Sequence, residues 1–282
     1  MQTHPRERAA QCAKSLCTEP FLKWPGGKRL LADTIIELLP SGRRLIEPFV
    51  GAGALFARSA FNSYVVSDVN QDLSSLYEIL RDSPVELLSC CASLFDAVAA
   101  LPDVYYTRRD RFNALPFGVE RAALFVYLNR FGFNGLCRYN RRGLFNVPIG
   151  RHAGTPTLPL EAMRHWSGKL QRAAILNGDF EAAISLAARG DVAFFDPPYA
   201  SETACFVGYA GNSFTWKDQI RVASCARSLA RSGVPVLVTN HDLPKIRQLY
   251  KGADIVSLNV RRSIGRSAES RRIVSEVAAL FT

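Results

Sequence analysis

The sequence predicts an α/β protein in which a parallel sheet is covered by helices and interrupted by one mainly helical insertion. Three observations support this fold class. Residues 44–68 contain an apolar run, a glycine turn, a helical pattern and a second apolar run, which is the order of a parallel βαβ unit. From about residue 70 to residue 160 helical patterns replace this alternation, which resumes near residue 170. A hydrophobic share of 48% and a charged share of 21% are typical of a globular chain.

The first βαβ unit is preceded by a helix. Apolar residues at helical spacing predict this helix at residues 29–39, and Pro40 ends it. Residues 44–50 are then the first strand, residues 55–60 a helix, and residues 64–68 a second strand that ends in an acidic residue.

The later elements divide the chain into domains. We expect a flexible tail at residues 1–20, a discontinuous main domain at residues 21–70 and 160–282, and an inserted domain at residues 71–159. The last two apolar runs are expected to pair as strands. The predicted segments are helices at 72–81, 84–94, 120–129, 219–231 and 245–250, and strands at 192–196, 234–239, 255–260 and 273–281.

Basic residues are in excess. The chain has 35 Lys and Arg against 25 Asp and Glu, a net charge of +10, which favours a polyanionic partner, although basic proteins without one exist. Between Arg121 and Leu160 there are six arginines and no acidic residue. Within this window, residues 129–143 are too polar for a core and too aromatic for a plain linker. The insertion is therefore a basic as well as a helical block.

Neither metal binding nor membrane insertion is predicted. The seven cysteines form no C-x-x-C pair and the four histidines are isolated, so metal-ligand spacing is absent. We expect reduced thiols and a cytoplasmic location. No apolar run is long enough for a membrane span, and the first twenty residues lack the apolar core of a signal peptide.

The first motif is the glycine turn after the first strand, Gly51-Ala-Gly53. Glycine there lets a ligand approach the backbone at the carboxyl edge of the sheet, and Asp68 at the end of the next strand is placed to accept hydrogen bonds from ribose hydroxyls. Phe56 stands where a dinucleotide fingerprint has its third glycine, which disfavours a pyrophosphate ligand. A tight turn without a ligand explains the same residues.

The second motif is Asp196-Pro-Pro-Tyr199, which directly follows a predicted buried strand. Its two prolines lack N–H donors and fix φ, so the turn is stiff. A stiff turn suits a site in which a carboxylate, a free carbonyl and an aromatic face must keep a fixed relation. The alternative is a strand exit with a surface tyrosine.

The third motif, Lys-Trp-Pro-Gly-Gly-Lys at residues 23–28, precedes the first helix. It is either a turn into this helix with Trp24 in the core, or a loop over a ligand, with Trp24 as a lid and Lys28 reaching a carboxylate.

Together these motifs resemble those of the Dam family of DNA adenine N6-methyltransferases, which modify GATC. The resemblance implies a Rossmann-like S-adenosylmethionine-dependent methyltransferase fold, with residues 71–159 as a target-recognition domain. It extends from Phe21 to Phe281 and includes, in the family's order, residues 23–28, 47–53, 67–70, 134–140, 145–148, 177–180, 196–199, 239–242 and 260–264.

The resemblance implies S-adenosylmethionine as the methyl donor. A cationic sulfonium tolerates the carboxylates of these motifs, whereas a phosphate cofactor would be repelled. Asp179 and Phe180 are implied at the cofactor's adenine, one bonding its amino group and one lining its ring. The implied cofactor contacts are Trp24, Lys28, Glu47, Phe49, Gly51, Gly53, Asp68, Asp179, Phe180 and Asp196.

The implied reaction is direct methyl transfer to N6 of adenine. This amino group is a poor nucleophile because its lone pair is delocalised into the ring. Asp196 and the carbonyl of Pro197 are expected to accept its hydrogens and to orient the lone pair, while Pro198 stiffens the turn and Tyr199 stacks on the base. Because the amino group is inaccessible inside a duplex, the base must be flipped out.

The implied partner is double-stranded DNA, recognised mainly by the insertion. Arg138 and Leu136 are expected at base edges, since the arginine fork matches O6 and N7 of guanine. Asn134 is expected near the vacated position, Phe133 as a wedge and Pro148 at the outer base. Further implied contacts are Lys23 at a guanine, Arg130, Asn140 and, at phosphates, Arg141, Arg142 and Arg151.

The insertion also departs from the family's pattern. Phe131, Phe133 and His152 stand where the family commonly has tyrosine. A phenyl ring still serves as a wedge, but the phenolic hydrogen bond is lost. For Arg141 and Arg142 a solvated surface charge is the alternative interpretation.

Other functions fit parts of the sequence. Cytosine N4 methylation, or methylation of RNA, would use the same tetrapeptide, and it is the insertion that favours adenine in DNA. A DNA-binding homologue without catalysis is disfavoured by the joint presence of Lys28, Asp68, Asp196 and Tyr199, and a basic structural protein by Phe56. We expect a monomer, because one flipped base needs one pocket.

Overall fold

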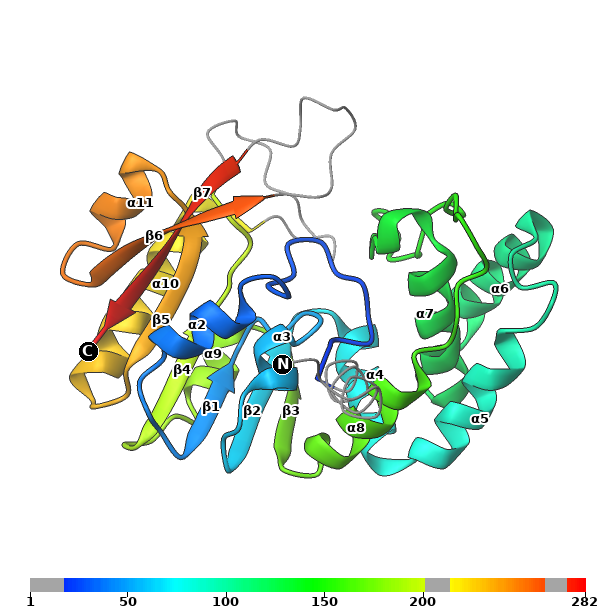
Figure 1. Cartoon of the computed structure of the whole chain (residues 1–282), viewed down its shortest axis with the longest axis horizontal. Coiled ribbons are helices and arrows are strands. Elements are labelled where there is room, and N and C mark those ends of the chain that lie inside the picture. Colours follow the sequence, from blue (N-terminus) through cyan, green and yellow to red (C-terminus); the bar gives the residue numbers. More distant parts are fainter. Residues whose placement is uncertain (1–17, 201–213, 262–272) are drawn as a thin grey trace, which may run out of the picture.

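A sheet of seven strands forms the centre of the part of the chain that the computed structural model describes, residues 18–200, 214–261 and 273–282 (Figure 1). The first five strands in spatial order are parallel, and β7 runs antiparallel to both of its neighbours. The spatial order is β3 (Ala173–Asn177), β2 (Ser63–Asp68), β1 (Arg44–Glu47), β4 (Asp191–Phe195), β5 (Val236–His241), β7 (Ile273–Phe281) and β6 (Asp254–Arg261).

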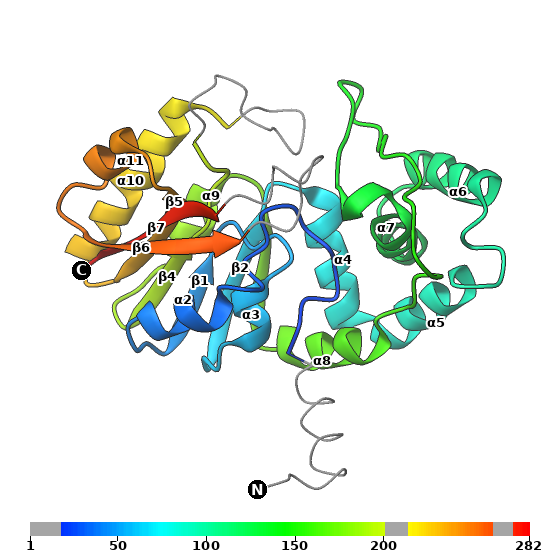
Figure 2. The same ribbon diagram turned by 45° about the horizontal axis from the view of Figure 1, so that its top comes forward.

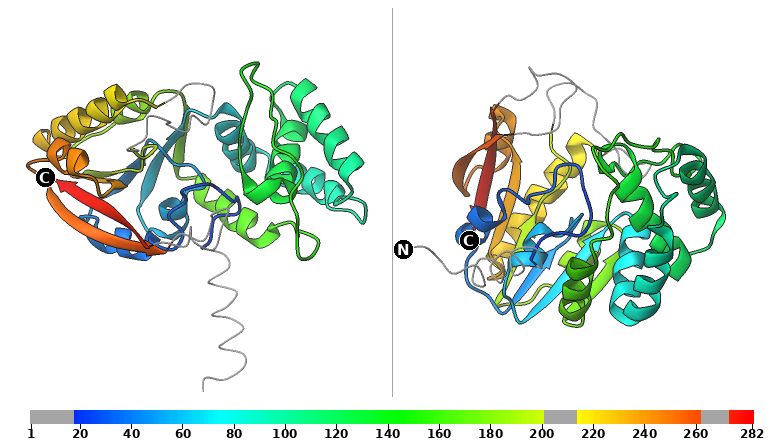
Figure 3. Two further views of the ribbon diagram at one scale, coloured as in Figure 1. Left: turned by 90° about the horizontal axis from the view of Figure 1, so that it is seen from above. Right: turned by 45° about the vertical axis from the view of Figure 1, so that its right-hand side comes forward.

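Helices cover both faces of this sheet, because alternate residues of each strand point to opposite sides. On β1, Leu45 belongs to one buried cluster and Ile46 to the other. Figure 3 shows α2 and α10 on opposite sides of the sheet. The Leu45 side packs against α2 (Ala32–Leu38), α3 (Ala54–Arg58), α4 (Gln71–Asp82) and α8 (Leu160–Leu170), and the Ile46 side against α9 (Phe180–Ile184), α10 (Trp216–Arg231) and α11 (Pro244–Leu249).

The segment of residues 84–135 packs beyond the β3 edge of the sheet, with α4 and α8 between (Figure 2). It contains α5 (Pro84–Leu94), α6 (Pro102–Ala114), α7 (Val119–Phe131) and the short 3-10 helix η1 (Phe133–Gly135). Proline at the first position of α5 and α6 loses no hydrogen bond, since that N–H has no partner within a helix. Every residue from Ala122 to Asn129 is buried, so α7 is the central helix of this segment.

The predicted α/β fold class is confirmed, and so is the pairing of the last two strands. Five elements, α6, η1, α8, β3 and α9, were not predicted. In β3 only Ala173 is buried, so this edge strand lacks a buried apolar run, and α6 buries only Tyr105 and Phe112 of its thirteen residues. Of the predicted tail, residues 1–17 lie outside the described residues. Glu19 forms ion pairs with two arginines of the main domain.

Candidate active site

The tetrapeptide Asp196-Pro-Pro-Tyr199 follows the buried strand β4 and is held by its neighbours. Asp196 Oδ1 accepts a hydrogen bond from Thr239 Oγ1 at 2.7 Å and lies 2.8 Å from Lys28 Nζ. The side-chain amide of Gln219, a buried residue of α10, donates to the Pro198 carbonyl at 2.7 Å. The turn is therefore fixed from β5, from α10 and from the loop before α2.

Tyr199 is anchored through its hydroxyl. It donates to Oε2 of Glu276, a buried residue of β7, at 2.8 Å. The edge of the His241 ring packs against the phenol, with 4.9 Å between centroids, and Lys28 Nζ lies 4.5 Å from the centre of the Tyr199 ring. Burial, and then the carboxylates of Asp196 and Glu276, raise the pKa of Tyr199 well above its usual value. The phenol therefore stays protonated and keeps its ring in one orientation.

The glycine turn between β1 and α3 lies directly against a tryptophan on each side. Gly51 and Gly53 adopt left-handed backbone conformations, with φ of 47° and 62°. A Cβ on Gly51 would lie 3.0 Å from the Trp24 ring, and one on Gly53 would lie 2.4 Å from the ring of Trp166. Both positions thus require glycine, for conformation and for space.

Asp68 connects the ends of β1 and β2. Its Oδ2 accepts the N–H of Gly51 at 3.1 Å, and its Oδ1 accepts the N–H of Asn70 at 2.9 Å. Burial raises the pKa of Asp68, and these backbone hydrogen bonds oppose that rise. The carboxylate consequently holds the glycine turn in register with the end of β2.

Glu47 is the last residue of β1 and is buried. Its Oε1 has no hydrogen-bond partner among the described residues. Burial raises the pKa of Glu47 to about 8, against the opposing effect of the Lys169 ammonium, while the charge of Asp196 adds to the rise. A buried, unsatisfied acceptor of this kind destabilises the fold unless a function needs it.

Two aromatic rings and an acidic residue complete this edge of the sheet. The ring of Phe180, buried at the start of α9, lies 5.1 Å from that of Phe49. Asp179 caps α9 by accepting the N–H of Glu181 at 3.0 Å, and it pairs with Arg221 at 2.8 Å. The exposed Asp179 thus lies beside a hydrophobic surface made by two phenyl rings.

These groups lie at one edge because β3, β2, β1 and β4 are parallel neighbours. Glu47, Asp68 and Asp196 end or follow three adjacent strands, and Asp179 follows the fourth. The chain leaves β1 toward β2 on one side, whereas β4 lies on the other, so the strand order reverses between β1 and β4. Ligands of open α/β sheets bind at this kind of crevice.

The sequence matches the family model described as D12 class N6 adenine-specific DNA methyltransferase over residues 24–264. The chain belongs to this family. It therefore methylates N6 of adenine in DNA, and the predicted family and enzyme class are confirmed.

Curated relatives of this D12-class methyltransferase carry the name DNA adenine methylase. The Haemophilus influenzae protein is 42% identical over 267 residues, which cover 93% of both chains. The protein of Escherichia coli strain K12 is 42% identical over 263 residues, 93% of this chain and 94% of its own. That of Vibrio cholerae serotype O1 is 40% identical over 265 residues, 93% of this chain and 95% of its own.

The structure brings together most of the residues that the sequence singled out in this methyltransferase. Lys28 contacts both Asp196 and Tyr199, Gly51 contacts Asp68, and Trp24 adjoins the glycine turn. Among the described residues no group of three or more potential metal ligands occurs, and no helix is long and apolar enough to cross a membrane.

Sequence reasoning missed the residues that hold the tetrapeptide in place. Thr239 and Asn240 lay in a stretch noted only for its resemblance to the family, and neither Gln219 nor Glu276 was considered. Asn240 donates to Gln219 and accepts the N–H of Ala200, so it secures the tetrapeptide from both sides. Of these residues, only Glu276 could have been found from the sequence. It is an acidic residue within the apolar run of β7, and a buried carboxylate on a strand needs a hydrogen-bond partner.

The predicted base-contacting residues lie on η1 and in the loop after it. Asn134 has a left-handed conformation, with φ of 53°, and is exposed together with Phe133. The backbone N–H of Phe133 donates to the Pro148 carbonyl at 2.9 Å, which places the predicted wedge beside the predicted outer-base contact. Leu136 is partly buried. Phe133, Asn134 and Pro148 are thus exposed, and the backbones of Phe133 and Pro148 are in direct contact.

The arginines of the insertion differ in their surroundings. Arg138 is exposed and donates to the side chain of Asn146 at 2.8 Å, which orients its guanidinium. Arg130 is partly buried, its Nε has no hydrogen-bond partner among the described residues, and burial lowers its pKa. A buried guanidinium nitrogen without a partner is costly, because burying a charged group without compensation is unfavourable. The side chains of Arg141, Arg142 and Arg151 are exposed.

Lys23 and Asn140 complete the predicted set. Asn129 fixes the backbone of Lys23 through two hydrogen bonds, of 2.9 and 2.7 Å. Partial burial, and then the charge of Arg130, lower the pKa of Lys23. Asn140 instead uses its side-chain oxygen within the loop, where it accepts the N–H groups of residues 142 and 144.

Proposed function

We propose that this enzyme takes its methyl group from S-adenosylmethionine and transfers it to the adenine of GATC after flipping that base out of duplex DNA. The observation that carries the proposal is the position of the Asp196–Tyr199 turn beside the glycine turn and Asp68, at the crevice between β1 and β4. In this proposal residues 21–70 and 160–282 form the catalytic domain, and residues 71–159 form the target-recognition domain.

The residues at the sheet edge fit this cofactor. Gly51 and Gly53 bring the backbone of the turn against the rings of Trp24 and Trp166, where a Cβ would intrude. Phe49 and Phe180 offer an apolar surface to an adenine ring, with Asp179 beside it for the amino group. Lys28 supplies a cation for the carboxylate of the cofactor, and Asp68 supplies oxygens for its ribose hydroxyls. Glu47 supplies a further hydrogen-bond acceptor, because its Oε1 has no partner among the described residues. When bound, S-adenosylmethionine supplies an electrophilic methyl group on a sulfonium.

The tetrapeptide residues orient the amino group. Asp196 and the Pro197 carbonyl accept the two N6 hydrogens, so the nitrogen lone pair points out of the purine plane. The donor's methyl carbon–sulfur bond would break as the N6–carbon bond forms, and its electron pair would stay on the sulfur as a neutral thioether. The Asp196 carboxylate would take the proton that N6 then releases. Tyr199 holds the purine by stacking, and its bond to Glu276 fixes the angle of the ring. No covalent enzyme intermediate is needed.

The insertion supplies target recognition. Arg138, oriented by Asn146, reads a guanine in the major groove. Phe133, Asn134 and Pro148 occupy the space that the flipped adenine leaves, and Leu136 lies against a neighbouring base. Lys23, close to Arg130, reads a second guanine, while the exposed arginines bind phosphates and set the position of the protein on the duplex.

The decisive experiment incubates the purified enzyme with labelled S-adenosylmethionine and a set of oligonucleotides, followed by mass spectrometry of the nucleosides. The set contains a GATC duplex, duplexes with one base pair of the site exchanged, a single strand and an RNA of the same sequence. We expect N6-methyladenine in the GATC duplex at a rate far above that in any other. N4-methylcytosine, label in RNA, or binding of DNA without any methyl transfer would contradict the proposal.

A further inference from the structure

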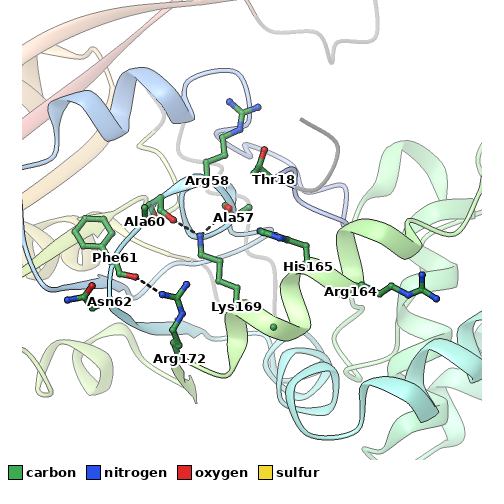
Figure 4. A pocket seen from close by; sticks show the side chains of 12 residues that line it. Thr18, Ala57, Arg58, Ala60, Phe61, Asn62, Arg164, His165, Lys169 and Arg172 are labelled. Atoms are coloured by element: carbon green, nitrogen blue, oxygen red, sulfur yellow. Dashed lines mark hydrogen bonds between the residues drawn. The ribbon is translucent and has the colours of Figure 1, made fainter. Parts of the chain in front are cut away.

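A basic pocket lies at the edge of the sheet opposite the tetrapeptide. Its volume is about 580 Å³, and no Asp or Glu is among its lining residues. The lining comes from the end of α3, from the loop that leads to β2 and from the last two turns of α8 (Figure 4). Five of the side chains are basic, namely Arg58, Arg164, His165, Lys169 and Arg172.

Two of these five basic side chains form ion pairs with carboxylates outside the pocket. Arg58 pairs with Glu19 and Asp33, and Arg164 pairs with Glu161. The other three, at positions 165, 169 and 172, form no ion pair within the described chain. Arg172 donates only to a backbone carbonyl, at 3.4 Å. Within the described chain, three of the five basic side chains of the pocket are therefore not paired with a carboxylate.

Lys169 is the innermost of these groups, with 8% of its surface exposed. Its ammonium donates to the carbonyls of Ala57 and Ser59, at 3.1 and 2.5 Å. Burial lowers the pKa of Lys169 to about 8, with a further contribution from Arg172, while Glu47 opposes the shift. Burial, and then Lys169, lower the pKa of the neighbouring His165. A bound anion would relieve the repulsion among these cations.

The position of the pocket separates it from the substrate. The strands β1, β2, β3 and β4 are parallel, and the tetrapeptide follows the carboxyl end of β4. The pocket instead contacts the residues just before β2 and β3, which lie at the amino ends of the strands. A duplex held at the catalytic edge has no need of these side chains. The DNA substrate at the catalytic edge therefore does not account for this cluster of basic side chains.

We propose that this pocket is a binding site for a phosphorylated small molecule, whose phosphate group is held by His165, Lys169 and Arg172. A volume of about 580 Å³ exceeds the needs of a phosphate ion and lies in the range for metabolite-sized ligands. Phe61 and Asn62 line the same pocket and extend it beyond the cations with an apolar and an amide group. Such a site lets a phosphorylated metabolite bind without blocking the crevice that serves catalysis.

The test is isothermal titration of the full chain with inorganic phosphate and with a nucleoside 5′-monophosphate, at constant ionic strength in a chloride buffer. We expect one saturable site per chain for both ligands. Arg172→Gln and His165→Gln should each weaken binding about tenfold, because each removes a charge-assisted hydrogen bond. Both side chains are outside the proposed catalytic and DNA-binding residues, so methyl transfer without phosphate should match the wild type and report correct folding.

The matched control is Arg141→Gln, which removes one arginine from the proposed DNA-binding loop. It should bind phosphate as the wild type does. The proposal is overturned if no saturable binding is found, if Arg172→Gln binds normally, or if Arg141→Gln and not Arg172→Gln loses the site. Displacement of phosphate by a duplex without GATC from the wild type would assign the pocket to the DNA backbone and would equally overturn the small-molecule proposal.

Discussion

Replacing Glu276 with alanine removes the acceptor of the Tyr199 hydroxyl without touching the proposed reacting atoms. The bond is 2.8 Å long and its acceptor is buried. A hydrogen bond to a charged group contributes roughly 1.5–3 kcal/mol. If this free energy holds the ring in its stacking position, its loss lowers kcat about 10- to 150-fold. Glu276→Gln retains an acceptor and should restore most of the rate.

The assay is steady-state methylation of a GATC duplex, with kcat and both KM values measured for each variant. A positioning role predicts a fall in kcat with little change in the KM for DNA or for S-adenosylmethionine. Tyr199→Phe keeps the ring and removes the hydroxyl, so it is the partner for a double-mutant cycle. The double variant should be no slower than the slower single variant. Additive losses, or an unchanged kcat in Glu276→Ala, would refute the reasoning.

Three further predictions concern stability, pH and site recognition. Gly53→Ala places a Cβ 2.4 Å from an indole ring at a φ of 62° and should lower the free energy of unfolding by about 2–5 kcal/mol in urea denaturation. Gly143→Ala is the control, because Gly143 has a similar φ but open space where the Cβ would lie. A larger loss of stability in Gly143→Ala than in Gly53→Ala would contradict this explanation. Folding raises the pKa of Glu47 from 4.5 to about 8, so the folded state binds a proton that the unfolded state releases. Stability from this group is full below pH 4.5 and lost as the pH rises through about 8. Glu47→Gln should remove this loss of stability at high pH. An unchanged dependence of stability on pH in this variant would argue against the raised pKa of Glu47. Arg138→Ala should lose roughly 1–3 kcal/mol of discrimination against exchanged GATC base pairs, measured as ratios of kcat/KM, whereas Arg141→Ala should weaken all sequences alike.

Local patterns predicted the elements whose sequence signal matches their burial. The strand before Gly51 and the strand before Asp196 are apolar runs that end at chemically distinctive residues, and both were predicted within a few residues. The edge strand β3 was missed because only its first residue is buried. The spatial order of the strands is set by long-range packing, which periodicity along the chain does not encode.

The same distinction applies to the site. The motifs at Gly51, Asp68 and Asp196 could be found from sequence because each follows a strand end, and parallel strand ends meet at one edge. The partner of Tyr199 is 77 residues away on an antiparallel strand, so no spacing rule connects the two. Likewise, Gln219 supports the tetrapeptide from α10, a helix that the sequence predicted without any part in the site.

The central claim is that Asp196 orients the adenine amino group for methyl transfer. The most direct measurement is the single-turnover rate of Asp196→Ala on a GATC duplex, beside the dissociation constant of the same duplex. We expect the rate to fall at least about 10²–10³-fold, the loss typical when a preorganised polar group is removed from a reacting centre, and the DNA affinity to stay close to that of the wild type. A wild-type rate of methyl transfer in this variant would contradict it.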